Sequence, residues 1–234
     1  DEQHRFGVQQ RLYLAEKGIN TNILLMSATP IPRTLALAQY GEIEQVILKE
    51  KPAFQKPIIT KVSNTDKIRD IEILLKKKIS NVSQVYWICP LVEASETQKY
   101  KDVETRFKSL KNIFGSEVEM LHGKIKSDQK EKIIQDFQKG RIKILVATTV
   151  VEVGIDNKNA DYIIIENAEK FGLSQLHQLR GRVGRGNNQG YCFALYGKDL
   201  PDNTINRLKI FKENLDGFKL SEKDLEIRGT GDIL

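Results

Sequence analysis

The 234-residue sequence contains few of the features that mark a secreted or membrane protein. It has only two cysteines, Cys89 and Cys192, and each lies in an apolar run that predicts a buried strand. Two distant cysteines are able to pair in principle, but we favour reduced thiols in a cytoplasmic protein. No apolar run approaches the roughly 18 residues of a membrane-spanning helix. The polar residues 1–5 show no secretory signal, so we expect no membrane association.

The sequence also lacks internal repeats, low-complexity segments and the spacing of a zinc site. Its three histidines, His4, His122 and His177, are not grouped with cysteines, which argues against metal ligation by histidine. The net charge of +6 arises from 37 basic and 31 acidic side chains. A basic balance favours a polyanionic partner, although many basic proteins bind none.

After residue 50, short apolar runs rich in β-branched residues alternate with amphipathic stretches. This alternation predicts an α/β fold with a mostly parallel sheet and helices on both faces. The expected strands are 84–91, 117–121, 143–147, 162–165 and 191–196, and the expected helices are 68–79, 97–114, 127–139 with Ser127 as its N-cap, and 174–182. Residues 46–59, with two prolines, are predicted to be a linker, and residues 204–234 a charged helical tail.

Two segments near the start carry residue types used in phosphoryl transfer. Asp1 and Glu2 form an acidic pair, which would suit holding Mg²⁺ on nucleotide phosphates and polarising water. Ser27 and Thr29 place hydroxyls at the end of a short apolar strand, where they could relay a nucleotide-dependent change. Taken alone, the first segment is more often a solvated terminus and the second a capped turn.

A third segment, residues 147–156, follows the expected strand 143–147. Loops at the carboxyl ends of parallel strands are where open α/β sheets bind ligands. Thr148 offers a hydroxyl and a backbone N–H to a phosphate, Gly154 permits close backbone approach, and Asp156 suits a ribose hydroxyl. The alternative is an ordinary loop with a glycine turn.

The most specific segment is Gln178-Leu-Arg-Gly-Arg-Val-Gly-Arg185, with three arginines in six residues. Arginine side chains stabilise phosphate charge in a transition state when they approach closely, and the glycines remove side chains that would block that approach. Arg182 and Arg185 share a face if the turn between them is helical. A solvated basic loop is the alternative, but it rarely has this glycine spacing.

Taken in order, these segments resemble the motor motifs of superfamily 2 helicases. More narrowly, the sequence resembles the RecG family of ATP-dependent DNA helicases over nearly the whole chain. The stretches that carry this resemblance are 1–11, 28–37, 84–96, 151–156, 165–186 and the tail 217–234. The tail is also similar to that of the transcription–repair coupling translocase, which stays as the alternative; Tyr86–Leu91 favours RecG.

The resemblance implies ATP and Mg²⁺ as cofactors and a RecA-like second helicase lobe. Asp1 and Glu2 would be catalytic and would hold Mg²⁺ through the nucleotide, and Arg182 and Arg185 would act as catalytic arginine fingers. Lys124 and Thr148 would contact DNA, and Arg228 would couple hydrolysis to translocation. The residues implied in ATP binding or in coupling its site to the second lobe are Gln3, His4, Ser27, Thr29, Gly154, Asp156, Gln178 and Gly181.

The sequence departs from the family in lacking a Gly-x-x-x-x-Gly-Lys-Ser/Thr loop and a branched-DNA wedge domain. We therefore expect residues 1–49 to be the C-terminal remnant of the first motor lobe and residues 50–198 the complete second lobe. Residues 199–234 would begin the translocation-coupling element.

The expected function is that of a monomeric, cytoplasmic ATP-dependent helicase that remodels branched double-stranded DNA in recombination and repair. We expect the chain alone to lack ATPase activity. The alternative function for the isolated chain is that of a non-catalytic nucleic-acid-binding lobe. An RNA helicase is a third possibility, which the tail argues against.

Overall fold

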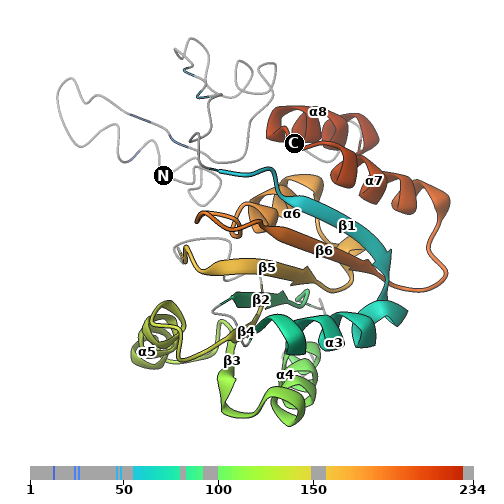
Figure 1. Cartoon of the computed structure of the whole chain (residues 1–234). Coiled ribbons are helices and arrows are strands. Elements are labelled where there is room, and N and C mark those ends of the chain that lie inside the picture. Colours follow the sequence, from blue (N-terminus) through green and yellow to red (C-terminus); the bar gives the residue numbers. More distant parts are fainter. Residues whose placement is uncertain are drawn as a thin grey trace. The chain divides into compact units, whose positions relative to one another are not determined.

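In the computed structural model, the described residues are 55–79, 83–91, 100–148 and 157–228. Five single residues of the first fifty are also described: Tyr13, Leu24, Met26, Val46 and Leu48. The chain divides into two compact units, one spanning Ile47–Leu215 and the other combining Asp1–Val46 with Asp216–Leu234. The sheet belongs entirely to the first unit (Figure 1).

The sheet has six strands in the order β1-β6-β5-β2-β4-β3, and every pairing among them is parallel. The strands are β1 (Ile59–Asn64), β2 (Gln84–Ile88), β3 (Val118–Leu121), β4 (Ile144–Ala147), β5 (Ala160–Ile165) and β6 (Tyr191–Tyr196). Strands β2, β4 and β5 are buried along their whole length. They form near-continuous apolar runs because helices cover both faces of a parallel sheet, which confirms the predicted fold class.

The helices of the described residues are α3 (Ile68–Lys78), α4 (Lys101–Phe114), α5 (Ser127–Gln138), α6 (Leu173–Arg180), α7 (Asp202–Glu213) and α8 (Gly217–Arg228). Short 3₁₀ turns occupy Thr65–Lys67, Gly115–Glu117 and Ala168–Lys170. Helix α8 lies in the second unit, where Asp216 begins it by accepting a hydrogen bond from the Phe218 N–H at 2.8 Å.

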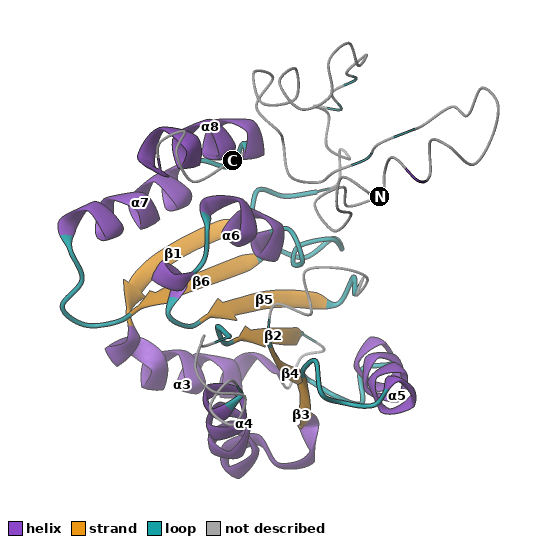
Figure 2. Ribbon diagram, turned by 180° about the vertical axis from the view of Figure 1, so that it is seen from behind, coloured by secondary structure: helices purple, strands orange, loops and turns teal. Residues whose placement is uncertain are grey.

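Alternate side chains of the strands point to opposite faces, and each face is packed against its own helices. Helices α3 and α4 bury Leu75 and Leu110 in one cluster with Trp87 of β2. On the other face, the ring of Phe137 from α5 lies 5.0 Å from that of Tyr86. Helices α6 and α7 cover the same face near β1 and β6 (Figure 2).

Several sequence-based expectations need correction. Strand β1 begins inside the predicted linker and was not expected, because its Ile-Thr-Lys-Val-Ser-Asn sequence is a partly exposed edge strand without an apolar run. The strand expected over 84–91 ends at Ile88. The N-cap of α5 is Lys126, and Ser127 is already helical.

The expected helix 174–182 ends at Arg180, so Arg182 lies outside it. The compact unit that holds the sheet extends through residue 215. It therefore includes α7, and the predicted lobe boundaries at residues 49 and 198 stay predictions.

Candidate functional site

The arginine segment leaves α6 through a tight turn. The N–H groups of Gly181 and Arg182 donate to the carbonyls of His177 and Leu179, both at 3.0 Å, and these bonds close the helix. Gly184 then adopts φ +68°, which favours glycine, and Arg185 Nε donates back to the Gly181 carbonyl at 2.9 Å. Arg182 and Arg185 therefore come from a turn beyond α6, so the condition under which they would share a helical face is not met.

This turn lies at the amino ends of the strands. The Gly184 N–H donates to the carbonyl of Ala160, the first residue of β5, at 3.2 Å. A Cβ on Gly184 would lie 3.2 Å from Gly190 Cα, and one on Gly186 only 2.6 Å from the Lys158 carbonyl oxygen. Backbone packing therefore favours glycine at both positions, whereas the sequence suggested that Gly184 clears space for a phosphate.

Gln178 is another predicted site residue of this region. It lies on α6, is 8% exposed, and its side-chain Nε2 has no hydrogen-bond partner among the described residues. A buried amide donor without an acceptor is costly, so this nitrogen marks a position where an acceptor from outside the described residues would be stabilising.

The first arginine of the segment, Arg180, has a different environment from the other two. It is 2% exposed, and its guanidinium donates to the carbonyls of Phe211 at 2.9 Å and Asn214 at 2.8 Å, at the C-terminal end of α7. It also contacts His177 Nδ1 and the Thr60 hydroxyl, and lies 4.5 Å from the Phe211 ring centroid. Burial lowers its pKa. Arg180 thus joins α6 to α7.

The predicted DNA contacts lie at the opposite ends of the strands. Lys124 follows β3 and Thr148 follows β4, and these two strands are neighbours. Thr148 is fully buried, its N–H donates to the Leu121 carbonyl at 3.4 Å, and its hydroxyl has no hydrogen-bond partner among the described residues. The structure therefore brings Lys124 and Thr148 to one edge of the sheet.

An aromatic residue that sequence reasoning missed joins this edge. The Tyr100 ring lies 4.8 Å from the His122 ring, and Lys124 Nζ lies 5.1 Å from the Tyr100 ring centroid. Tyr100 precedes α4, far from Lys124 in sequence, and no local pattern links the two. Burial lowers the pKa of His122; Glu104 opposes this, and Lys124 and Lys130 lower the pKa further.

Between Thr148 and Asn157 the chain passes from the carboxyl end of β4 to the amino end of β5. The side-chain amide of Asn157 donates to Gln84 Oε1 at 3.0 Å, at the first residue of β2. Gln84 in turn donates to the carbonyls of Phe137 and Ile142. Gln84 thus joins Asn157 to the C-terminal part of α5 at the amino end of β2.

Other predicted site residues lie outside the described residues: Asp1, Glu2, Gln3, His4, Ser27, Thr29, Gly154 and Asp156. Arg228 is the last residue of α8, and its side chain also lies outside them. Within the described part of the chain, no group of histidine, cysteine or acidic residues could hold a metal ion. No helix there is long and apolar enough to cross a membrane. Cys89 and Cys192 are both buried, and they do not form a disulfide with each other.

The parallel sheet, with an arginine turn at one end of its strands and a lysine–threonine edge at the other, has the fold of a helicase second motor lobe. The chain belongs to the helicase conserved C-terminal domain family, whose sequence profile matches residues 65–187.

Individual relatives of the chain are more specific than this family, and they are RecG helicases. The chain is 48% identical over 237 aligned residues to the ATP-dependent DNA helicase RecG of Borreliella burgdorferi, and 46% identical over 235 to that of Staphylococcus aureus. Each alignment covers 100% of this chain and 34% of the relative. The chain thus spans about a third of the length of these relatives. The resemblance to RecG predicted from the sequence is confirmed.

Solved structures agree with this assignment. A structure of RecG bound to a three-way DNA junction is 38% identical with a TM-score of 0.77, over 89% of this chain and 27% of that one. The helicase Lhr of Mycobacterium smegmatis, bound to single-stranded DNA and AMP-PNP, is 20% identical with a TM-score of 0.55. It covers 79% of this chain and 26% of that chain, and shows the fold alone.

Proposed function

We propose that this chain supplies the second motor lobe of an ATP-dependent DNA helicase that remodels branched DNA. The observation that carries the proposal is the turn after α6. It holds Arg182 and Arg185 partly buried at the amino end of β5, separate from the edge that carries Lys124 and Thr148. Two sites at opposite ends of one sheet suit a motor that binds nucleotide and nucleic acid at once.

At the nucleotide site, Arg182 and Arg185 stabilise the charge that develops on the transferred phosphoryl group. The Arg185 Nε–H donates to the Gly181 carbonyl, which fixes the orientation of the guanidinium group. Gln178, whose Nε2 has no hydrogen-bond partner among the described residues, is a further part of this site. Arginines in this role contribute roughly 10³–10⁵ to the rate of related phosphoryl transfers.

The remaining nucleotide contacts rest on residues outside the described ones. Asp1 and Glu2 are carboxylates of the kind that Mg²⁺ prefers, and they hold the ion through ATP. Gln3, His4, Ser27 and Thr29 couple the nucleotide to the second lobe, and Gly154 and Asp156 approach it from the loop between β4 and β5. Residues 1–49 are the part of the first lobe that carries these groups, and residues 50–198 form the second lobe.

At the other edge, the exposed Lys124 contacts a phosphate of the DNA, and the buried Thr148 hydroxyl is available as a donor to the same strand. A branched substrate is supported by the similar RecG structure, which was solved on a three-way DNA junction. The protein acts as a monomer in the cytoplasm, in DNA repair and recombination, and Arg228 belongs to the element that couples hydrolysis to movement.

ATP turnover by the longer protein that carries this chain tests the proposal. We expect a three-way DNA junction to stimulate turnover more than linear duplex or RNA. Arg182→Ala and Arg185→Ala should lower kcat by roughly 10³-fold or more with nearly unchanged DNA affinity. Arg141→Ala, which removes an exposed arginine paired with Asp136, should leave kcat unchanged.

The chain alone should not turn over ATP, because its sequence contains no phosphate-cradling loop. Turnover without preference for the junction would contradict the assignment of substrate. A change in DNA affinity alone, from either arginine substitution, would contradict the role of that residue.

A further inference from the structure

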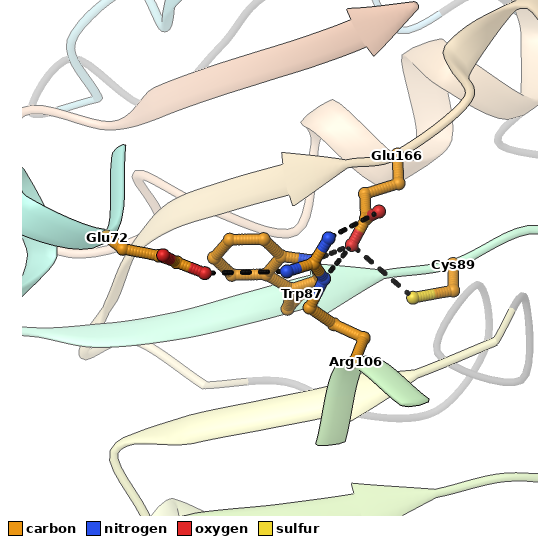
Figure 3. Close-up of polar contacts among 5 residues, drawn as sticks. All are labelled: Glu72, Trp87, Cys89, Arg106 and Glu166. Carbon is orange, nitrogen blue, oxygen red and sulfur yellow. Dashed lines mark hydrogen bonds and ion pairs between the residues drawn. The ribbon is translucent and has the colours of Figure 1, made fainter. Parts of the chain in front are cut away.

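A cluster of polar side chains lies at the carboxyl ends of β2 and β5, apart from the residues assigned above (Figure 3). Glu166 directly follows β5. Its carboxylate accepts hydrogen bonds from Trp87 Nε1 and Arg106 Nε, both at 2.5 Å, and from Arg106 Nη2 at 3.1 Å. The Cys89 thiol lies 3.9 Å from the same carboxylate. One carboxylate thus binds side chains from β2 and α4.

Arg106 is held on three sides. Its guanidinium lies over the Trp87 ring, 5.2 Å from the centroid, and it pairs at 3.4 Å with Glu72 of α3 as well as with Glu166 (Figure 3). The Arg106 and Glu166 side chains are only 17% and 13% exposed. Removing one partner of such a shielded pair leaves a charge poorly solvated, so the cluster resists rearrangement.

Chemistry by the cluster itself is not favoured. Burial raises the pKa of the Cys89 thiol well above its usual range, and the neighbouring Glu166 raises it further, so the reactive thiolate is disfavoured. With its carboxylate engaged by Trp87 and Arg106, Glu166 is better suited to hold a backbone segment in place than to react.

The segment that Glu166 begins leads directly into α6. The Glu166 N–H donates to the Ile88 carbonyl at 2.9 Å, which joins the segment to the end of β2. Farther along, Glu169 accepts from the Gly197 N–H at 3.3 Å, and Arg207 of α7 donates to the carbonyls of Glu169 and Phe171. Helix α6 starts two residues after Phe171.

Residues 166–172 are therefore fixed at both ends, and they cross from the face covered by α3 and α4 to the face covered by α6. We propose that Glu166 is a positioning residue for the candidate nucleotide site. Through its contacts with Trp87 and Arg106 it holds the start of this segment, and so sets where α6 presents Gln178 and the arginine turn. The inference rests on the proposed function for the chemistry of that site, but its geometry is a property of this chain alone.

Hydrogen exchange on the 234-residue chain tests the geometric part. Glu166→Gln keeps the side-chain volume but removes the charge that pairs with Arg106. We expect faster amide exchange in residues 166–180, with unchanged exchange in β3 and α5. Because Trp87 is the only tryptophan, its emission should shift in the same variant and report the lost contact directly.

Glu72→Gln is the matched control, since it removes the other carboxylate of Arg106 without touching Glu166. We expect it to leave exchange in residues 173–180 unchanged. Two results in Glu166→Gln would overturn the proposal. Faster exchange throughout the sheet would mean that Glu166 contributes to stability in general, and unchanged exchange in α6 would mean that it does not position this helix.

The chemical part needs ATP turnover by the longer protein. Glu166→Gln should lower kcat by about tenfold or more with unchanged DNA affinity, because a displacement of about 1 Å at a catalytic group costs up to about 10²-fold. An unchanged kcat beside altered exchange in α6 would overturn the positioning role. If the unsubstituted protein shows no ATP turnover with any nucleic acid, the proposed function fails, while the exchange measurement still decides whether Glu166 positions α6.

Discussion

Replacing Arg180 with methionine should destabilise the unit Ile47–Leu215, although it removes a buried cation. None of the four hydrogen-bond partners of Arg180 is acidic, and two are carbonyls at the end of α7 that no longer have helical donors. Burial lowers the pKa of Arg180, so its charge is held at a cost. The sign of the effect therefore depends on which of two opposing terms is larger.

The cost of leaving the two carbonyls without donors should exceed the gain from removing the buried guanidinium. Each buried acceptor that loses its donor costs about 1–3 kcal/mol, and both Phe211 and Asn214 lose theirs. The substitution also removes the desolvation cost of the buried guanidinium, which offsets part of this loss. We expect a net loss of about 2–4 kcal/mol in the free energy of unfolding, with a decrease in Tm of about 4–16 °C for a unit of this size.

Urea and thermal unfolding of the chain, followed by the fluorescence of Trp87, would measure this change. Arg141→Met is the matched control, because its side chain is 70% exposed and its pair with Asp136 contributes about 0–1 kcal/mol. Arg180→Lys should lie between the two, since one ammonium group cannot reproduce the spread of a guanidinium. If Arg180→Met matches Arg141→Met, or is more stable than the unsubstituted chain, the reasoning is refuted.

Three further predictions concern other parts of the chain. Gly186→Ala should cost about 1–3 kcal/mol of stability in urea unfolding, because its Cβ would lie 2.6 Å from the Lys158 carbonyl oxygen; an unchanged midpoint would contradict the close packing. Burial lowers the pKa of His122 from 6.5, so folding favours the neutral imidazole. This contribution to the free energy of unfolding is fully present above about pH 6.5 and is lost as the pH falls toward the lowered pKa. His122→Gln should weaken that pH dependence, and an identical pH profile would exclude His122 as its source. In the longer protein, Arg228→Ala should retain most DNA-stimulated ATP turnover and an unchanged Tm but lose junction unwinding; parallel loss of both activities would favour a structural role.

The sequence alone predicted the class of fold, which the structure confirms, and a candidate site that stays a prediction. Five of the six strands were expected. Strands β2, β4, β5 and β6 were visible because a strand buried on both faces is a run of apolar residues, a pattern that shows without knowing its neighbours. Strand β1 was missed because its polar residues and the prolines before it suggested a linker. The motif Gln178–Arg185 was found because arginines interleaved with glycines are a local pattern.

The different environments of the three arginines in that motif depended on tertiary structure. Arg180 and Arg182 are two residues apart, yet one is buried against the end of α7 and the other lies in the turn beyond α6. Similarly, Trp87 and Glu166 meet because β2 and β5 are adjacent in the order β1-β6-β5-β2-β4-β3. Local periodicity reports which side of an element is buried, but strand order decides what it is buried against, and that order arises only when the whole sheet assembles.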